Sequence, residues 1–278
     1  MISLEIPTSM NRVIIDLELS KGSLYYKNKG YPASRKGTKQ RDSNTVAKIR
    51  TICNEKRTYG SPRVRAILKR DHNIKLTHYM THSIMDEEDL LIHKHEKRQS
   101  RMHTGKISVE KSNMRWCSDI TSIKAWDKTK GRFAYIIDCC DRSVIAWRFS
   151  KHLQASDIEQ MMQEAIIKRF GGETPKALGL QFLHDNGPEY IEKQLKKSLA
   201  EWDVEDCNTP TYSPQSNGMS ESFNGTFKRD YVYMNCLDDF GTIKNQMEGW
   251  IKEYNTYAPH SSLDMMTPHE YFENYIAA

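Results

Sequence analysis

Three acidic residues from distant parts of the sequence place the strongest constraint on how this chain can fold. Asp119 closes a strand-like segment, Asp185 follows an apolar run, and Glu221 falls on the first turn of an expected helix. Thirty-five residues separate the last two acids. Carboxylate oxygens are the ligands that magnesium prefers, and such a site keeps positions open for phosphate and water. The pattern predicts phosphodiester chemistry on DNA.

The motifs around these acids are more specific than the acids themselves. Residues 212–224 read Tyr-Ser-Pro-Gln-Ser-Asn-Gly-Met-Ser-Glu-Ser-Phe-Asn and resemble the loop and helix of retroviral integrases. Residues 184–190 read His-Asp-Asn-Gly-Pro-Glu-Tyr, and residues 254–268 contain Tyr-Asn, Pro-His-Ser-Ser-Leu and Thr-Pro. Both segments resemble the second-frame (orfB) transposases of copy-out, paste-in bacterial insertion sequences. The chain therefore resembles the superfamily of DDE transposases and retroviral integrases.

The resemblance implies a metal-dependent enzyme and assigns its ligands. The DDE triad would be Asp119, Asp185 and Glu221, holding two Mg²⁺ ions, for which Mn²⁺ could substitute. Asp119 would bridge the ions, while the other two acids would each complete the shell of one ion. One ion would activate water or a 3′-hydroxyl, and the other would stabilise the leaving 3′-oxygen during in-line displacement. For the orfB type, the resemblance implies that the element's ends are joined first and that the resulting circle is inserted into target DNA.

The expected helix around Glu221 has two distinct sides. Its buried stripe recurs every four residues, at Met219, Phe223 and Phe227. Glu221, Gly225 and Lys228 fall within about 60° of one another on the opposite side. A carboxylate and a lysine two turns apart could hold metal and DNA phosphate together. A solvated helix face is the simpler interpretation of the spacing alone, and the motif around Asp185 reverses that preference.

Candidate DNA contacts lie beside the triad and in a basic segment before the core. Those beside the triad are Asn186, Asn217 and Lys228, with His184 as a weaker candidate behind them. Residues 93–111 carry many Lys and Arg side chains and few acids. A solvated linker is the default interpretation of such a run, but its position favours contact with the phosphate backbone, with Arg98 and Arg101 as the candidates.

Three further acids have local explanations. Asp138 ends a strand, and in related transposases an aspartate in this place is common without belonging to the triad, so we interpret it as structural support. Glu189 stands at the start of an expected helix and Asp141 in a turn, and acids are favoured at both kinds of position. We therefore exclude these three residues from the predicted metal site.

The segment that carries the triad predicts an α/β domain. An antiparallel meander is expected first and alternating helices and strands after it: strands at 115–123, 133–140 and 144–149, a helix from 156, a strand at 180–183, a helix at 188–202 and a strand at 204–207. Ser156 and Glu159 have the spacing of a capping box. The pattern alone supports a mixed α/β domain. The resemblance implies an RNase H-like catalytic core, with an integrase-type mixed sheet flanked by helices.

Short helices with a tight turn between them are expected before the core, near 45–56, from 62 and from 77. They are compatible with a helix-turn-helix-like module. The last of them runs into the acidic residues 86–89, which would repel phosphate. Contact with DNA and contact with another subunit therefore both remain open. A zinc site is not expected, because the two cysteines that it would need do not accompany His72, His78 and His82.

Five regions are expected along the chain. They are a leader (1–44), the helix-turn-helix-like module (45–92), the basic linker (93–112), the RNase H-like core (113–240) and a C-terminal helical extension of the core (241–278). A net charge of +5 over 278 residues is modest but suits a polyanionic partner. Six cysteines without a Cys-x-x-Cys pair, and no long apolar run, indicate a soluble protein of the reducing cytoplasm, associated with the nucleoid and not with a membrane.

The expected partners are DNA, as element ends and as target, and further copies of this chain assembled on it. Enzymes of the orfB type are often fused to an upstream frame that supplies end recognition, and this chain has no leucine heptads, so an upstream-frame protein is a further expected partner. Two other functions fit the motifs less well. A non-catalytic DNA-binding regulator would not need three spaced acids, and an RNase H-like hydrolase would not need the Tyr-Ser-Pro-Gln-Ser loop.

Overall fold

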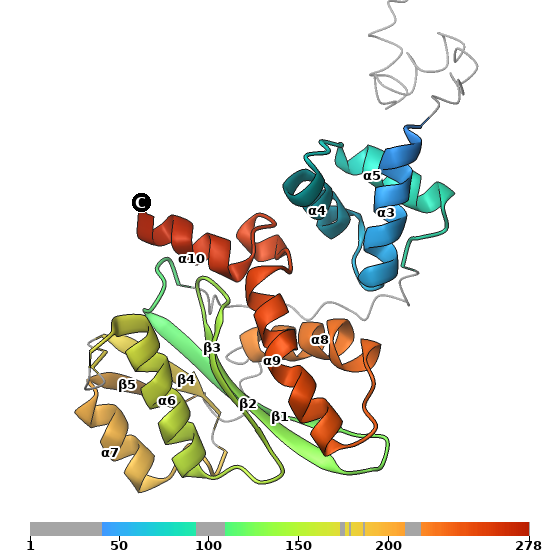
Figure 1. The fold of residues 1–278 in the computed structure, drawn as a ribbon. Coiled ribbons are helices and arrows are strands. Elements are labelled where there is room, and N and C mark those ends of the chain that lie inside the picture. The colour runs from blue at the N-terminus through green and yellow to red at the C-terminus, as the bar shows by residue number, and fades with distance from the viewer. Residues whose placement is uncertain are drawn as a thin grey trace, which may run out of the picture. The chain divides into compact units, whose positions relative to one another are not determined.

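The computed structural model describes residues 41–92, 109–172, 176–177, 179–185, 187–208 and 218–277 (Figure 1). Most of the expected leader and linker therefore lie outside the described residues. The same holds for four of the candidate DNA contacts, Asn186, Asn217, Arg98 and Arg101. No helix in the described ranges is both long and apolar enough to cross a membrane.

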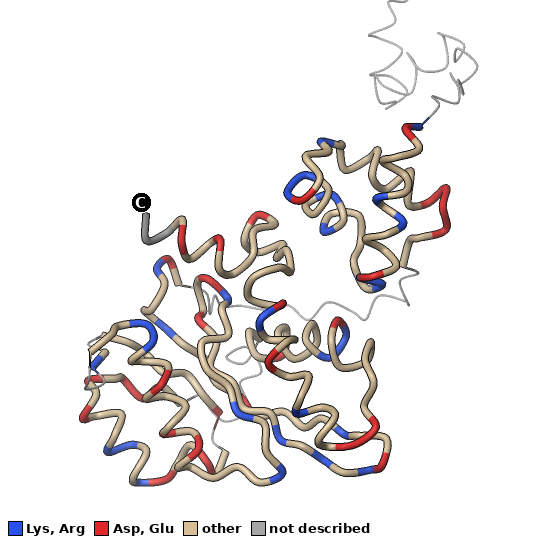
Figure 2. The backbone as a smooth tube through the Cα atoms, in the orientation of Figure 1, with Lys and Arg blue, Asp and Glu red and all other residues tan. Residues whose placement is uncertain are grey.

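The expected helical module is present as three helices, α3 (Ser43–Glu55), α4 (Ser61–His72) and α5 (His78–Glu87). It has apolar side chains of its own to bury, at Ile49, Ile52, Val64, Ile67, Leu68, Ile84 and Met85. The Thr77 side chain caps α5 by accepting a hydrogen bond from the Met80 backbone N–H at 3.1 Å. The acidic residues 86–89 form a continuous stretch at the end of α5 (Figure 2).

A five-stranded mixed sheet forms the centre of the segment that carries the three acids. Its strands are β1 (Arg115–Lys124), β2 (Lys130–Asp138), β3 (Val144–Ser150), β4 (Leu180–His184) and β5 (Val204–Asn208), in the order β3-β2-β1-β4-β5. The meander β1-β2-β3 is antiparallel, whereas β4 runs parallel to both β1 and β5. Because β1 and β4 are parallel neighbours, Asp119 and Asp185 come from adjacent strands that point the same way. The predicted α/β order is confirmed.

Helices cover both faces of this sheet (Figure 1). They are α6 (Ala155–Phe170), α7 (Lys193–Glu201), α8 (Gly218–Asp230) and α9 (Phe240–Thr256). The last helix, α10 (Pro268–Ala277), packs against α9, and short 3₁₀ turns occur at Val232–Met234 and Ser261–Leu263. Successive strand residues point to opposite faces. Trp116 and Ala134 therefore pack in one core with α6 and α7, and Cys117 and Phe133 pack in another core with α8 and α9.

The helix expected at 188–202 is shorter in the structure. It begins at Lys193, because the residues before it form a turn in which the Tyr190 N–H donates to the Gly187 carbonyl at 3.0 Å. This turn buries the Tyr190 side chain almost completely. The apolar spacing of 188–202 does not distinguish a turn held by a buried aromatic ring from the first turn of a helix.

The start of α6 also differs from the prediction. The helix begins at Ala155, and the Asp157 carboxylate accepts the Gln154 backbone N–H at 2.8 Å. The capping acid is thus Asp157 and not Glu159, because the N-cap is Gln154, two residues before the predicted N-cap Ser156. The helix lies in the expected segment between the meander and the strand at 180–183.

Gly131 on β2 is required by the packing of an aromatic ring. A Cβ at this position would overlap the ring of Phe149, which stacks on Phe240 with 5.0 Å between centroids. We expect Gly131→Ala to lower the free energy of unfolding by about 1–3 kcal/mol, because overpacking displaces the ring or the backbone. Urea unfolding measures the difference. Gly249→Ala on α9, where a Cβ meets open space, is the matched control, and equal losses in both variants would contradict this account.

Candidate active site

Asp119 lies on β1 opposite Tyr135 of β2, with its carboxylate partly buried. One carboxylate oxygen accepts the Ile120 backbone N–H at 2.8 Å, and the other accepts the Asn224 side-chain amide at 2.8 Å. Burial raises the pKa of Asp119, these hydrogen bonds oppose the change, and the negative charge of Asp185 raises it further. Asp119 and Asp185 are therefore close enough to repel each other.

Helix α8 lies along β1 and supplies two polar contacts to it. Asn224 contacts Asp119, and the Lys228 ammonium donates to the Thr121 hydroxyl at 2.7 Å. Four residues of helix rise about 6 Å and two residues of strand about 6.6 Å, so the two contacts fit a helix that runs nearly along the strand. The helix thereby brings the predicted DNA contact Lys228 to the strand that carries Asp119.

Lys228 is partly buried near Asp119. Burial lowers the pKa of its ammonium group, while the carboxylate of Asp119 raises it. A half-buried lysine next to a buried carboxylate holds a positive charge at the edge of the site. Such a charge would suit a phosphate near Asp119, and the contact of Lys228 with DNA stays a prediction.

Asp185 directly follows β4 and is held in a tight turn. Its carboxylate accepts the Gly187 backbone N–H at 2.9 Å, the local hydrogen bond by which aspartates stabilise turns. A Cβ on Gly187 would lie 2.9 Å from the same carboxylate oxygen. Glycine thus allows the backbone to approach Asp185 closely, which gives a physical reason for glycine in this motif.

His184, the last residue of β4, directly precedes Asp185, and its side chain is buried. Its Nε2 lies 2.7 Å from the Asp206 carboxylate of β5, and its Nδ1 lies 2.6 Å from the Asp185 backbone carbonyl. Its ring stacks on Tyr190, with 4.7 Å between centroids. The residue therefore orients the backbone of Asp185 from behind, in agreement with its prediction as a supporting residue.

Glu221 stands on the first turn of α8, exposed, one helical turn before Asn224. In the described ranges, no three His, Cys, Asp or Glu side chains lie close enough together to hold a metal ion. The structure thus brings Asp119 and Asp185 together but does not gather Glu221 with them, and the triad stays a prediction. The donor set still fits a divalent cation, because two neighbouring carboxylates, one of them largely buried, repel each other without a positive charge between them.

The prediction from sequence did not identify Asn224 as a site residue. The signal was available, because Asn224 is the last residue of the motif that contains Glu221. It lies one turn after Glu221 and bonds Asp119 directly. The contacts of His184 with Asp206 and of Tyr190 with Ser118 could not be predicted in this way, because they join segments that are distant in sequence.

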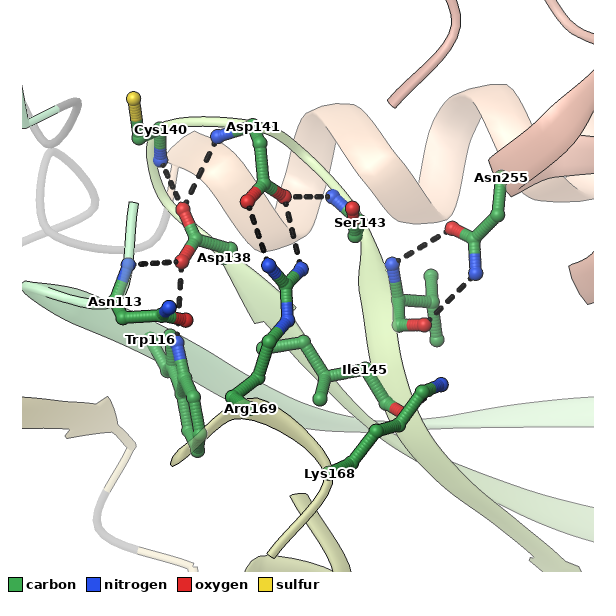
Figure 3. Close-up of polar contacts among 11 residues, drawn as sticks. Asn113, Trp116, Asp138, Cys140, Asp141, Ser143, Ile145, Lys168, Arg169 and Asn255 are labelled. Carbon is green, nitrogen blue, oxygen red and sulfur yellow. Dashed lines mark hydrogen bonds and ion pairs between the residues drawn. The ribbon is translucent and has the colours of Figure 1, made fainter. Parts of the chain in front are cut away.

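Asp138 is part of a buried structural network at the β2–β3 turn (Figure 3). One of its oxygens accepts the Asn113 N–H at 2.7 Å and the Trp116 indole N–H at 3.1 Å, and the other accepts the N–H groups of Cys140 and Asp141 at 2.7 and 3.1 Å. Burial, and then the charge of Asp141, raise the pKa of Asp138 to about 6. Four donors leave this carboxylate fully engaged, which agrees with its interpretation as support.

Asn255, in the C-terminal Tyr-Asn motif, also has a structural role (Figure 3). Its side-chain amide accepts the Val144 N–H and donates to the Val144 carbonyl, both at 2.9 Å. The amide thus forms the two hydrogen bonds with Val144, the first residue of β3, that a neighbouring strand would form. These bonds attach the end of α9 to the sheet.

Comparisons with known proteins agree with this architecture. Two models of the integrase core domain match residues 109–214 and 203–268, and an HTH-like domain matches residues 39–98. The transposase InsD of insertion element IS2 from Escherichia coli is 30% identical over 237 residues, which cover 83% of this chain and 78% of InsD. An uncharacterized protein of insertion element IS136 from Agrobacterium fabrum is 40% identical over 190 residues, which cover 67% of this chain and 97% of that protein.

Solved structures with similar folds include integrase and transposase domains. The catalytic core domain of HTLV-2 integrase in complex with magnesium has a TM-score of 0.45 and 17% identity, with 58% of this chain and 96% of that chain covered. The Mos1 transposase catalytic domain has a TM-score of 0.41 and 15% identity, with 59% of this chain and 77% of that chain covered.

The mixed sheet with helices on both faces is the fold of an integrase-type catalytic core. An HTH-like module precedes it in the chain. On the identity and coverage of its relatives, this chain belongs to the family of insertion-element transposases that carry this core.

Proposed function

We propose that this transposase cleaves and joins DNA strands at a metal site formed by Asp119, Asp185 and Glu221. The observation that carries the proposal is the placement of Asp119 and Asp185, each two residues beyond the paired residues Cys117 and Leu183 of β1 and β4, with Lys228 bonded to Thr121 of β1. Lys228 supplies one positive charge for two neighbouring carboxylates, and a divalent metal would balance the negative charge that remains. Glu221 enters the proposal through its motif and its position one turn before Asn224.

Two Mg²⁺ ions, for which Mn²⁺ could substitute, would activate the attacking oxygen and stabilise the leaving 3′-oxygen when bound. Asp119 would be the shared ligand, with Asp185 and Glu221 holding one ion each. Asn224 keeps the Asp119 carboxylate oriented through its amide. Lys228 presents its ammonium to a DNA phosphate at the edge of the site.

The DNA surface proposed here extends beyond the described residues. Asn186 and Asn217 flank the acids in sequence, and Arg98 and Arg101 lie in the basic segment before the core. We propose that they contact the DNA backbone, that several copies of the chain assemble on the element ends, and that an upstream-frame protein assists end recognition. The division into leader, module, linker, core and C-terminal extension belongs to the same proposal.

Metal removal tests this proposal directly. The purified chain, with and without its upstream-frame protein, is incubated with a duplex that carries the element's end and with Mg²⁺. We expect a nick that leaves a 3′-hydroxyl, which a polymerase can extend, and joining of that end to a second DNA. Excess EDTA should reduce both products below detection, and Mn²⁺ should restore them. Cleavage that persists in EDTA would contradict a metal-dependent reaction.

A further inference from the structure

Strands β1 and β4 stop pairing just before the two acids. Their last pair in the described residues is Cys117 with Leu183, and Asp119 and Asp185 stand two residues further along their strands. The regular ladder of backbone hydrogen bonds that fixes the distance between neighbouring strands therefore ends before the acids are reached. Beyond this point β1 stays paired with β2 and β4 with β5, but no backbone pairing joins β1 directly to β4 beside the acids in the described residues.

Tyr190 occupies the place where the strands separate. Its hydroxyl lies 2.8 Å from the hydroxyl of Ser118, and its ring stacks on the ring of His184 at an angle of 11° between planes. Ser118 directly precedes Asp119, and His184 directly precedes Asp185. A single buried side chain thus contacts the neighbours of both acids.

The contacts of Tyr190 lie on the face of the sheet opposite α8. Tyr190 packs in the core that contains side chains of α6 and α7, whereas Asp119 bonds Asn224 of α8. Because successive strand residues alternate between faces, Ser118 points away from the side on which Asp119 lies. Tyr190 therefore contacts the residues next to the acids from the α6 and α7 side of the sheet, whereas Asp119 faces α8.

The backbone connects Tyr190 to Asp185 over a short and tightly bonded segment. The Tyr190 N–H donates to the Gly187 carbonyl, and the Gly187 N–H donates to the Asp185 carboxylate, at 3.0 and 2.9 Å. A shift of Tyr190 is thus transmitted to Asp185 through two hydrogen bonds. Packing of the ring requires no hydroxyl, and a buried hydroxyl is costly unless it is bonded, so the bond to Ser118 is a feature separate from core packing.

We propose that Tyr190 is a positioning residue whose hydroxyl bond to Ser118 sets the separation of Asp119 and Asp185, and through it the affinity of the site for divalent cations. The proposal rests on the proposed function, because it takes both acids as metal ligands. Tyr190 itself contacts neither metal nor DNA in this account.

The test is Mn²⁺ binding by the full chain without DNA, measured as loss of the free Mn²⁺ signal in electron paramagnetic resonance. We expect Tyr190→Phe and Ser118→Ala each to weaken binding by about three- to tenfold, the effect of one lost hydrogen bond on the geometry of the site. The double variant should be no weaker than either single variant, because both changes remove the same bond. If the loss of Mn²⁺ affinity in the double variant equalled the sum of the two single losses in free energy, the proposal would be overturned.

Tyr231→Phe is the matched control, because Tyr231 is also buried and its hydroxyl has no hydrogen-bond partner among the described residues. We expect it to leave Mn²⁺ affinity unchanged. If the role of Tyr190 were merely to stabilise the fold, Tyr190→Phe would lower the unfolding temperature and leave Mn²⁺ affinity unchanged, and this result would overturn the proposal.

Asp185→Asn separates failure of this inference from failure of the proposed function. Loss of Mn²⁺ binding in Asp185→Asn, together with normal binding in Tyr190→Phe, would reject the positioning role and leave the metal site standing. Wild-type binding by Asp185→Asn would reject the metal site itself, and the positioning role with it.

Discussion

We expect Asp119→Asn to reduce DNA strand transfer by on the order of 10³-fold, equivalent to about 4 kcal/mol of transition-state stabilisation. The substitution removes the carboxylate proposed to be shared by both ions. Stability should be unchanged or slightly higher, because burial already disfavours the charged form of Asp119 and Asp185 repels it. Loss of activity without loss of stability distinguishes a functional acid from a structural one.

The measurement is joining of a pre-cut element end to target DNA, together with thermal unfolding of the same preparations. Glu248→Gln is the control, because it removes the same charge from an exposed position on α9. We expect the control to retain wild-type strand transfer. Retention of more than about one tenth of the activity by Asp119→Asn would be incompatible with a shared metal ligand.

The second large effect concerns stability. Arg169 of α6 pairs with both carboxylate oxygens of Asp141, at 3.1 and 3.2 Å, and both side chains are buried (Figure 3). The guanidinium group also lies 3.8 Å from the centre of the Phe272 ring of α10. We expect Arg169→Met to lower the free energy of unfolding by about 3–5 kcal/mol, because it leaves the Asp141 charge buried without the cation that pairs with it.

Two variants test this explanation of the Arg169 effect. Arg148→Met breaks a solvent-exposed pair with Glu164 and should cost less than about 1 kcal/mol. Arg169→Met combined with Asp141→Asn should be more stable than Arg169→Met alone, since no unpaired charge remains and the introduced amide can still accept the Ser143 N–H that Asp141 accepts. Urea unfolding at neutral pH measures all of them. A double variant less stable than the single variant would show that the loss comes from packing and not from charge.

The sequence was sufficient to predict the order of elements in the core, because each strand and helix has a periodicity or boundary of its own. Gly171 and Gly172 end α6, and the alternation on β1 to β3 indicates a meander. The segment before α7 was misassigned, because the turn at Tyr190 depends on burial between two strands. Local pattern contains no information about such a tertiary contact.

The site was predictable to a similar extent. The acids and Lys228 could be named from motifs and helical spacing, and the structure places Asp119, Asp185 and Lys228 in one neighbourhood. The bond between Ser118 and Tyr190 joins residues far apart in sequence, so spacing alone could not indicate it. The distance of Glu221 from the other two acids depends on how α8 packs along β1, a tertiary feature that helical spacing does not give.

Circle formation in cells tests the central claim most directly, because Glu221 is the one acid that the structure does not gather with the others. A plasmid that carries the gene with its own flanking DNA is introduced as wild type or as Glu221→Gln, each with and without the upstream frame. We expect excised circles from the wild type when the upstream frame is present, and none from Glu221→Gln. Circles at the wild-type level from Glu221→Gln would contradict the assignment of the three acids to one catalytic site.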